Sequence, residues 1–279
     1  MLPSRVDPRT ALAASGLRPR RSLGQSFLVD RRALERIAEA AVPDDSWSAV
    51  EIGAGTGALT LELAARAASV VAVEVDRALA DLTAGLFAGS ETVSIVNEDA
   101  RRLDLVALAP RRPVVVAGNI PYHLTGILLE QILESVPSPD RVVLTVQAEV
   151  AERIAAGPGS RAYGALSVLT ANAWRARRMF RIGRGAFHPP PDVDSAVVLL
   201  EPRDAPLCPA PLRDAFRRLV IGVFSHRRKT LRNALACAGF PTDRIDATTA
   251  LPGVRLGDRP ERHGVEAFVD LARALASSP

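Results

Sequence analysis

The chain has 279 residues, of which 48% are hydrophobic, 24% charged and only 4% aromatic, a composition that excludes disordered, collagen-like and disulfide-stapled proteins. No apolar stretch is long enough to cross a membrane and the N-terminus lacks the apolar region of a signal peptide, so we expect a cytoplasmic protein. The formal net charge of +4 favours an anionic partner, whereas the isolated Cys208 and Cys237 favour neither a disulfide nor a metal site.

Short β-branched runs alternate with helical patterns along the first half of the chain. The predicted strands are 49–52, 70–74, 93–96, 114–118 and 142–147, and the predicted helices are 57–66, 77–87, 125–134 and 148–156. Such alternation is typical of a parallel, doubly wound sheet. We expect the last strands within 166–180 and 195–200, which gives a sheet of about seven strands ending near Arg203.

A small helical domain is predicted to follow this sheet. Four prolines between Pro202 and Pro211 break regular structure and mark a boundary. Residues 212–279 have the pattern of three or four helices, with Gly239 and Pro241 between two of them and a loop at 251–260.

A glycine-rich turn follows the first predicted strand. The sequence from Glu51 to Gly57 reads E-I-G-A-G-T-G and is followed directly by a helix. Glycines in such a turn let the backbone approach a ligand closely. The spacing differs from the G-x-G-x-x-G of dinucleotide folds and therefore favours a nucleoside without phosphates, although a purely structural tight turn has the same pattern.

Two acidic residues follow the next two strands. Glu74 can accept hydrogen bonds from both hydroxyls of a ribose, and Asp99 can accept one from an exocyclic amino group such as that of adenine. The carboxyl ends of the strands in an open α/β sheet are where ligands bind. Each acid taken alone is equally consistent with a helix cap or a solvated loop.

The fourth strand ends in the sequence Gly118-Asn119-Ile120-Pro121-Tyr122. The exocyclic amine of adenine is a poor nucleophile because its lone pair is delocalised into the ring. The side-chain oxygen of Asn119 and a backbone carbonyl near Ile120 or Pro121 can hold the amine hydrogens and favour a pyramidal, attacking nitrogen. Tyr122 can stack on an extruded base, but the same residues also fit an ordinary strand-ending turn.

Basic residues gather in two stretches of the second half of the chain. Five arginines and no acid occupy 175–184, and seven basic residues against one acid occupy 212–235. These stretches are typical of polyanion binding and equally of a solvated arginine face.

Together these motifs resemble the class I S-adenosylmethionine-dependent methyltransferases, and within them the rRNA adenine N6,N6-dimethyltransferase family. Four further segments extend the resemblance over roughly residues 20–270: Leu23–Leu28, Ala156–Gly164, Phe187–Ser195 and Phe224–Asn233. The last of these is similar to the basic helix of the family's C-terminal domain. The resemblance implies a Rossmann-like, seven-stranded, mostly parallel sheet with a small C-terminal helical domain. The implied divisions are an N-terminal arm and cofactor-covering segment at 1–32, a cofactor-binding catalytic domain at 33–203 and a helical rRNA-binding domain at 204–279.

The resemblance also implies the function and the site. The expected reaction is the dimethylation of two adjacent adenosines near the 3′ end of 16S rRNA in the assembling small ribosomal subunit, with S-adenosylmethionine as cofactor and no metal. The implied cofactor contacts are Ser26, Leu28, Gly53, Gly55, Glu74, Asp99 and Asn119. The implied catalytic residues are Asn119, Pro121, Tyr122 and Phe187, with Tyr122 and Phe187 enclosing the adenine, and the implied RNA contacts are Arg227, Arg228, Lys229 and Arg232. Without the resemblance, Phe187 is equally a core aromatic.

The chain departs from the usual family pattern at three positions. Ser26 stands where Asn is usual, His226 where Gln is usual and Ala54 where many relatives have Pro. None of these changes removes a group that the chemistry needs.

Two alternatives remain open. One is the related class of 23S rRNA adenine N6-methyltransferases that confer macrolide resistance. The other is a nucleic-acid-binding assembly factor without catalytic activity.

Overall fold

The computed structural model describes residues 2–276. The first residue of the expected N-terminal arm, Met1, and the last three of the expected helical domain, 277–279, lie outside the described residues. Its described residues form two compact units, one of 2–151 with Arg177–Pro202 and the other of Glu152–Ala176 with 203–276. Each is described by itself.

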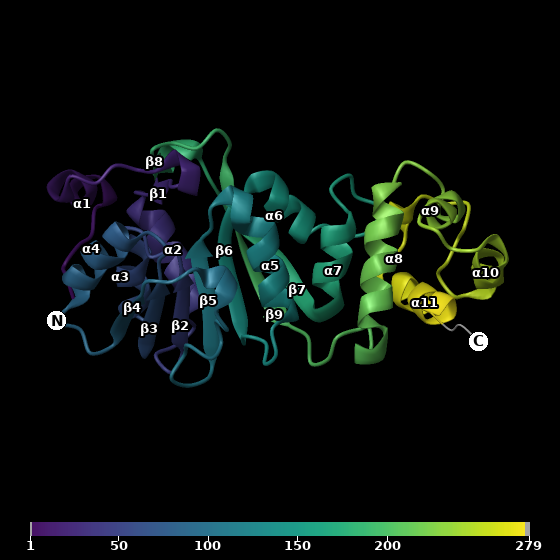
Figure 1. Cartoon of the computed structure of the whole chain (residues 1–279), viewed down its shortest axis with the longest axis horizontal. Coiled ribbons are helices and arrows are strands. Elements are labelled where there is room, and N and C mark those ends of the chain that lie inside the picture. The colour runs from purple at the N-terminus through teal and green to yellow at the C-terminus, as the bar shows by residue number, and fades with distance from the viewer. Residues whose placement is uncertain (1, 277–279) are drawn as a thin grey trace. The chain divides into compact units, whose positions relative to one another are not determined.

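The first unit contains a seven-stranded sheet in the order β4-β3-β2-β5-β6-β9-β7, as Figure 1 shows. The strands are β2 (Ser48–Ile52), β3 (Ser69–Val73), β4 (Val93–Val96), β5 (Val114–Asn119), β6 (Arg141–Gln147), β7 (Trp174–Ile182) and β9 (Ser195–Pro202). β4, β3, β2, β5 and β6 pair in parallel, and β9 is antiparallel to β6. The predicted mostly parallel sheet is therefore confirmed.

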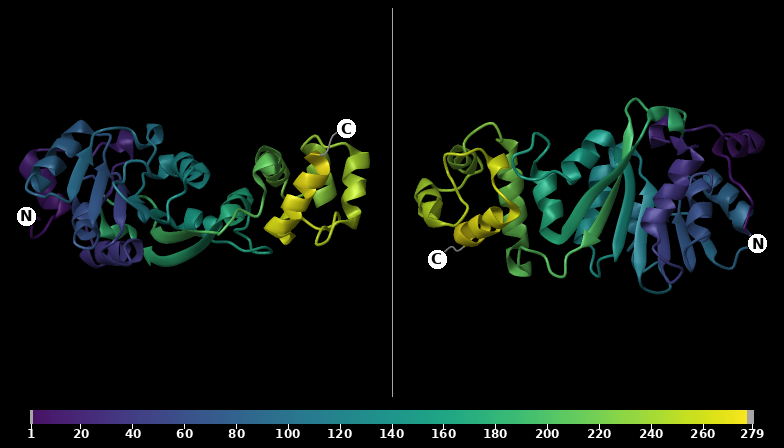
Figure 2. Two further views of the ribbon diagram at one scale, coloured as in Figure 1. Left: turned by 90° about the horizontal axis from the view of Figure 1, so that it is seen from below. Right: turned by 180° about the vertical axis from the view of Figure 1, so that it is seen from behind.

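Helices connect these strands and lie against both faces of the sheet, as Figure 2 shows. The α-helices that begin in this unit are α1 (Pro8–Ser15), α2 (Arg31–Ala41), α3 (Ala58–Ala64), α4 (Arg77–Phe87), α5 (Thr125–Glu134) and α6 (Ala148–Ile154). Asp30 and Asp76 begin α2 and α4, because each side chain accepts a hydrogen bond from a backbone N–H of the first turn. The crossover helices predicted between the strands are confirmed.

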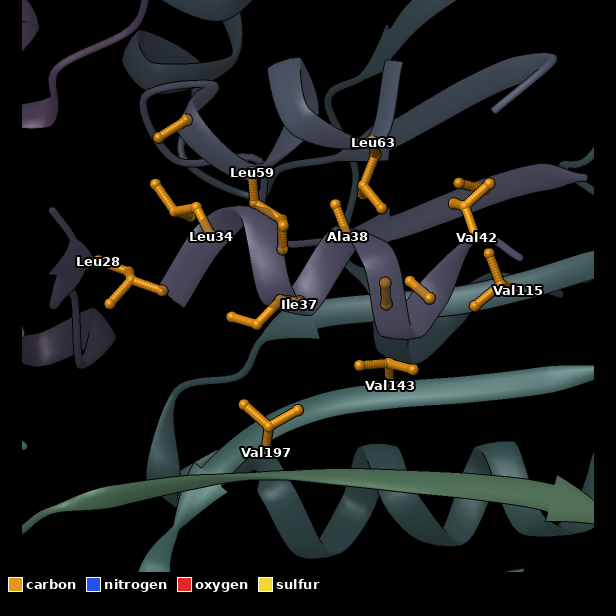
Figure 3. Close-up of a cluster of buried hydrophobic side chains, with 14 of the residues drawn as sticks. Leu28, Leu34, Ile37, Ala38, Val42, Leu59, Leu63, Val115, Val143 and Val197 are labelled. Carbon is orange, nitrogen blue, oxygen red and sulfur yellow. The ribbon is translucent and has the colours of Figure 1, made fainter. Parts of the chain in front are cut away.

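The main core of the first unit lies between α2, α3 and one face of the sheet. Ile37 and Ala38 of α2 are fully buried, and Figure 3 shows Ile37 beside Val143 and Val197 of the strands. The packing of this helix against the middle of the sheet leaves the carboxyl ends of the strands for other groups.

A second, two-stranded sheet in the first unit was not predicted. β1 (Phe27–Leu28) pairs antiparallel with β8 (Phe187–His188). Two-residue strands carry too little periodicity to be read from sequence, and their pairing joins segments far apart in the chain.

The second unit is helical. Its α-helices within the described residues are α7 (Ala165–Ala173), α8 (Arg213–Ser225), α9 (Leu231–Cys237), α10 (Thr242–Ala247) and α11 (Val265–Ala276). The three or four helices predicted after residue 212 are confirmed as four, with Gly239 and Pro241 between α9 and α10. The core contains Phe216, Leu219 and Phe268, all nearly fully buried.

Two sequence expectations about this part of the chain were wrong. The segment 166–173 belongs to a helix and not to a strand, because Ala and Leu favour helix and Ser167 accepts the N–H of Gly164 at its start. The segment Phe224–Asn233 is not one basic helix, because α8 ends at Ser225 and Thr230 caps a new helix, α9.

The expected divisions at 1–32, 33–203 and 204–279 stay a prediction. The compact units divide the chain near Arg203, and the segment Glu152–Ala176, which includes the first residues of β7, groups with the helical unit. The reason is visible in the second core, which includes Tyr163 and Val168 of this segment. In the described residues, no helix is long and apolar enough to cross a membrane.

Candidate active site

A cavity of about 260 Å³ lies at the carboxyl ends of the sheet strands. It collects nearly all of the residues predicted for the cofactor and the target base. These are Ser26, Gly53, Gly55, Glu74, Asp99, Asn119, Pro121, Tyr122 and Phe187. Their chemical roles remain predictions. The parallel sheet brings Gly53, Glu74, Asp99 and Asn119 to one place as expected, and the pairing of β1 with β8 adds Ser26 and Phe187.

The glycine turn forms one wall of the cavity. Gly53 and Gly55 have φ angles of +81° and +56°, a region that residues with a side chain rarely adopt. A Cβ at Gly55 would lie 3.1 Å from the ring of Phe27. Glycine at this position therefore serves both the backbone conformation and the close approach of Phe27.

Glu74 is held in the wall beside this turn. The backbone N–H of Gly55 donates to its Oε2 at 2.9 Å and that of Asp76 donates to its Oε1 at 2.9 Å. Burial raises the pKa of the carboxyl, and the two backbone hydrogen bonds oppose that rise. Each oxygen keeps a further lone pair, so the carboxylate can accept two ligand hydroxyls.

Glu51, which sequence analysis quoted without a role, lies fully buried at the end of β2. Thr60 donates its hydroxyl to Glu51 Oε2 at 2.6 Å. Burial raises the pKa of Glu51 to about 8, so the carboxyl is neutral at pH 7. This bond joins β2 to α3 across the glycine turn.

Asp99 lines the cavity after β4, the neighbour of the strand that precedes Glu74, and caps the short 3-10 helix η2 (Ala100–Arg102). Its Oδ1 accepts the backbone N–H of Arg101 at 3.0 Å, and the guanidinium of Arg101 lies 2.6 Å from Oδ2. Hydrogen bonding to Arg101 lowers the pKa of Asp99, so the group is a carboxylate acceptor. The sequence contained Arg101, but nothing in its pattern indicated this pairing.

Asn119 ends β5 at the centre of the site. Its Nδ2 donates to the backbone carbonyl of Ser26 at 2.9 Å. A carbonyl oxygen can only accept, so this contact fixes the orientation of the amide and leaves Oδ1 as an acceptor. The next residue, Ile120, donates its N–H to Thr145 O at 3.2 Å, which holds the turn against β6.

The N-terminal segment crosses the site and is tied down at several points. Ser26 donates its hydroxyl to Pro189 O at 2.8 Å, so this hydroxyl is already engaged. Gln25, which sequence analysis did not single out, donates to Asp76 at 3.1 Å and accepts the N–H of Arg20. The only sequence feature that indicated a role for Gln25 is its position in the segment Leu23–Leu28, which resembles the cofactor-covering segment of the family.

Leu28 does not line the cavity with the other predicted cofactor contacts. Its side chain is 4% exposed and packs in the core with Leu34 and Ile37, as Figure 3 shows. In the two-residue strand β1, successive side chains point to opposite sides, so Phe27 faces the cavity and Leu28 faces the core. A backbone contact from Leu28 to the cofactor remains a prediction.

Tyr122 and Phe187 both line the cavity. The Tyr122 hydroxyl lies 2.8 Å from Ser195 Oγ, which holds the ring at its far end, and burial raises the pKa of the phenol. Phe187 is 2% exposed and also belongs to the main core, as a core aromatic would, while its stacking on the target base stays a prediction.

The predicted RNA contacts lie in the second unit. Arg227, Arg228 and Lys229 are in the turn between α8 and α9, where Arg228 and Lys229 are exposed. Arg227 donates to Arg161 O at 3.1 Å, and Arg232 on α9 forms an ion pair with Asp246. Of these four cations, Arg227 and Arg232 therefore have a partner within the protein, whereas Arg228 and Lys229 are exposed side chains.

The arginines of 175–184 are also partly paired. Arg177 contacts Glu201 at 3.4 Å and Arg181 contacts Asp194 at 2.9 Å.

The described residues were also searched for a metal site. Among residues 2–276, no group of three or more His, Cys, Asp or Glu side chains is arranged to hold a metal ion.

Comparisons with known proteins cover most of the chain. The family profile described as Ribosomal RNA adenine dimethylase matches residues 16–277. The sequence is 40% identical to Ribosomal RNA small subunit methyltransferase A of Geobacter sulfurreducens over 272 residues, which is 96% of this chain and 99% of the relative. It is 42% identical to the protein of the same description from Anaeromyxobacter dehalogenans, over 96% of this chain and 98% of the relative.

Two solved structures are similar over almost the same length. A dimethyladenosine transferase from Plasmodium falciparum has a TM-score of 0.76 and 25% identity, covering 88% of this chain and 95% of that one. The 23S rRNA methyltransferase ErmE has a TM-score of 0.70 and 28% identity, covering 90% of this chain and 100% of that one.

Proposed function

The chain belongs to the ribosomal RNA adenine dimethylase family, and on this premise we propose that it dimethylates N6 of adenosines in the rRNA of the small ribosomal subunit. The finer proposal is that the targets are two adjacent adenosines near the 3′ end of 16S rRNA, modified in the cytoplasm during subunit assembly. S-adenosylmethionine is the methyl donor of this family.

The residues around the cavity fit this cofactor. Glu74 has an acceptor lone pair on each oxygen for the two ribose hydroxyls, while Gly53 and Gly55 leave room for a ligand against the backbone. Asp99, after the neighbouring strand β4, is an ionised acceptor suited to the adenine amino group. Bound S-adenosylmethionine supplies a methyl group already activated by the sulfonium, so positioning is the main task of the protein.

The single observation that carries the proposal is the orientation of Asn119. Its amide nitrogen is committed to Ser26 O at 2.9 Å, so its Oδ1 is the atom available to a target amine. The carbonyl of Pro121 accepts the N–H of Leu124 at 2.9 Å, which favours the carbonyl of Ile120 as the second acceptor. Two acceptors at the two amine hydrogens direct the nitrogen lone pair toward the methyl carbon and assist loss of the proton.

Tyr122 and Phe187 supply aromatic surface for the target base. Because Ser195 holds the Tyr122 hydroxyl, the ring has a fixed plane on which an extruded adenine can stack. Phe187 is held by the pairing of β8 with β1. Ser26 directly precedes β1, and its carbonyl accepts the hydrogen bond that orients Asn119.

The small-subunit substrate is favoured over 23S rRNA by the extent of the sequence similarity. The small-subunit relatives are 40–42% identical over 96% of this chain, compared with 28% for the 23S enzyme. A similar fold alone does not separate the two substrates.

The decisive experiment measures transfer of labelled methyl groups to unmethylated small subunits and, separately, to 23S rRNA, with the modified base mapped by primer extension. Label in dimethyladenosine near the 3′ end of 16S rRNA is the expected result. Label only in 23S rRNA would move the protein to the resistance-type enzymes. Label in neither, together with no binding of S-adenosylmethionine in calorimetry, would support a binding protein without catalytic activity.

Replacement of Asn119 tests the mechanism. Asn119→Ala removes the oriented Oδ1 acceptor, so we expect kcat for small-subunit methylation to fall by about 10²–10⁴-fold. The measurement is single-turnover methyl transfer at saturating cofactor. The dissociation constant of S-adenosylmethionine, measured by calorimetry, is the control for loss of the cofactor site. Activity of the variant within tenfold of the parent would contradict this role.

A further inference from the structure

One side chain outside the cavity contacts the loop that carries Asp99. Gln131 on α5 donates its Nε2 to two backbone carbonyls, Ala100 O at 3.0 Å and Leu103 O at 2.7 Å. Both carbonyls belong to or directly follow η2, whose N-cap is Asp99. Both hydrogens of the amide are used by these bonds.

The loop that contains Asp99 needs such an anchor. It follows β4, which is the edge strand of the seven-stranded sheet and is itself only partly buried. Asp99 Oδ1 is directed by the N–H of Arg101 in the same turn, so the place of the carboxylate depends on the place of η2. Gln131 fixes that turn from the adjoining helix.

The same helix follows the turn at residues 119–122, here named the catalytic turn for its proposed role. α5 begins at Thr125, directly after the 3-10 helix η3 (Tyr122–Leu124), and its Leu128 lines the cavity one turn before Gln131. A helix is a rigid connection over this length. Gln131 therefore sets the distance between the wall at Asp99 and the turn at Tyr122.

The chemistry of the contact requires a donor. Gln131 Oε1 is buried and has no hydrogen-bond partner among the described residues, so the orientation of the amide is set by the two carbonyls alone. A glutamate of the same shape would place its carboxylate oxygens against the carbonyl oxygens of Ala100 and Leu103, and neither side could donate. A lysine would again donate to these carbonyls.

We propose that Gln131 is a positioning residue that holds Asp99 at the distance from the catalytic turn needed to accept the adenine amino group of S-adenosylmethionine. This inference rests on the proposed function, because it takes Asp99 as the adenine acceptor. Its effect falls on cofactor affinity more than on the methyl-transfer step itself.

The test is calorimetric measurement of the dissociation constant for S-adenosylmethionine. We expect Gln131→Met, which has nearly the same shape and no donor, to raise it about tenfold. We expect Gln131→Lys to stay within about threefold of the parent, because the donor is restored. Glu130→Met, at the adjacent exposed position of α5, is the matched control and should leave the constant unchanged.

A double-mutant cycle separates this role from general stabilisation of the fold. If Gln131 acts through Asp99, Asp99→Ala and the double variant Asp99→Ala with Gln131→Met bind the cofactor equally well. Additive losses of affinity would overturn the proposal. So would loss of kcat at saturating cofactor with no change in the dissociation constant, since that result assigns Gln131 to the catalytic turn.

Folding of each variant is checked by its thermal midpoint. If Gln131→Met does not fold, Gln131→Glu decides: a folded Gln131→Glu protein with the parent's affinity overturns the proposal, and a weaker one supports it. A parent protein that does not bind S-adenosylmethionine refutes the proposed function and this inference together. A parent that binds, with a Gln131→Met variant that binds equally, refutes only the inference.

Discussion

Two buried glutamates flank the glycine turn, and their hydrogen-bond partners differ. Glu74 accepts two backbone N–H groups, which favour the ionised form needed for ligand hydroxyls. Glu51 accepts one hydroxyl from Thr60 and has a pKa of about 8, raised first by burial and also by the charge of Glu74. Burial raises the pKa of both carboxyls, and at Glu74 the two backbone hydrogen bonds oppose that rise.

Stability should therefore fall with rising pH because of Glu51. Its pKa is higher in the folded state than the ordinary value of 4.5, so its stabilising contribution is complete below that value and is lost as pH rises through about 8. From about pH 5 to 8 the expected slope from this group is at most about 1.4 kcal/mol per pH unit. Glu51→Gln should remove this slope from the free energy of unfolding measured in urea.

The exposed Glu91 is the control for this prediction, because Glu91→Gln removes a carboxyl without changing the interior. The parent and Glu91→Gln should share one pH profile, and Glu51→Gln should be flatter. Three identical slopes between pH 5 and 8 would show that Glu51 does not titrate as argued.

At the scale of the element, the pairing of β2 with β5 brings two backbones unusually close. Ile52 lies opposite Gly118, and a Cβ at Gly118 would be 2.4 Å from Ile52 O. This contact occurs one residue before Asn119, so the absence of a side chain at Gly118 sets the position of the catalytic turn.

Gly118→Ala should destabilise the protein by about 1–3 kcal/mol, because the backbone of β2 must shift to admit the methyl group. Gly85→Ala is the matched control. Gly85 is inside α4 with nothing within 4 Å of its added Cβ, so this change should stabilise by about 0.5–1 kcal/mol. Urea unfolding of both variants gives the comparison, and equal effects of the same sign would contradict the close-approach argument.

For the molecule as a whole, net charge and its distribution point to RNA, but individual cations differ in what they offer. Arg228 and Lys229 are exposed in the turn between α8 and α9, whereas Arg232 is already paired with Asp246. A cation that has a carboxylate partner must give up that partner before it can hold a phosphate. A count of charges alone treats these residues as equal.

Replacement of both Arg228 and Lys229 by Ala should weaken binding to small subunits. The slope of log K against the logarithm of salt concentration should become shallower by up to about 2, or about one for each lost phosphate contact. Arg232→Ala should lower it less, because Asp246 already neutralises that guanidinium. The measurement is subunit affinity against potassium chloride concentration, with the affinity for S-adenosylmethionine as the control. A larger change in slope for Arg232→Ala would reverse this assignment.

Sequence by itself determined the sheet, its crossover helices and the gathering of the site residues. These follow from local patterns, because each strand or helix is specified by its own apolar periodicity and each strand end by its glycines, acids or Asn-x-Pro-Tyr. Parallel pairing then brings Gly53, Glu74, Asp99 and Asn119 to one edge without further information.

Only the tertiary structure decided how the side chains within that site are oriented. The bond from Asn119 to Ser26, the hydroxyl of Ser26 on Pro189, the inward side chain of Leu28 and the pairing of Arg232 with Asp246 all depend on contacts between distant segments. The packing of residues 152–176 with the helical unit has the same origin. Local periodicity specifies which faces are apolar, but not which distant partner covers them or which hydrogen-bond partner a polar group meets there.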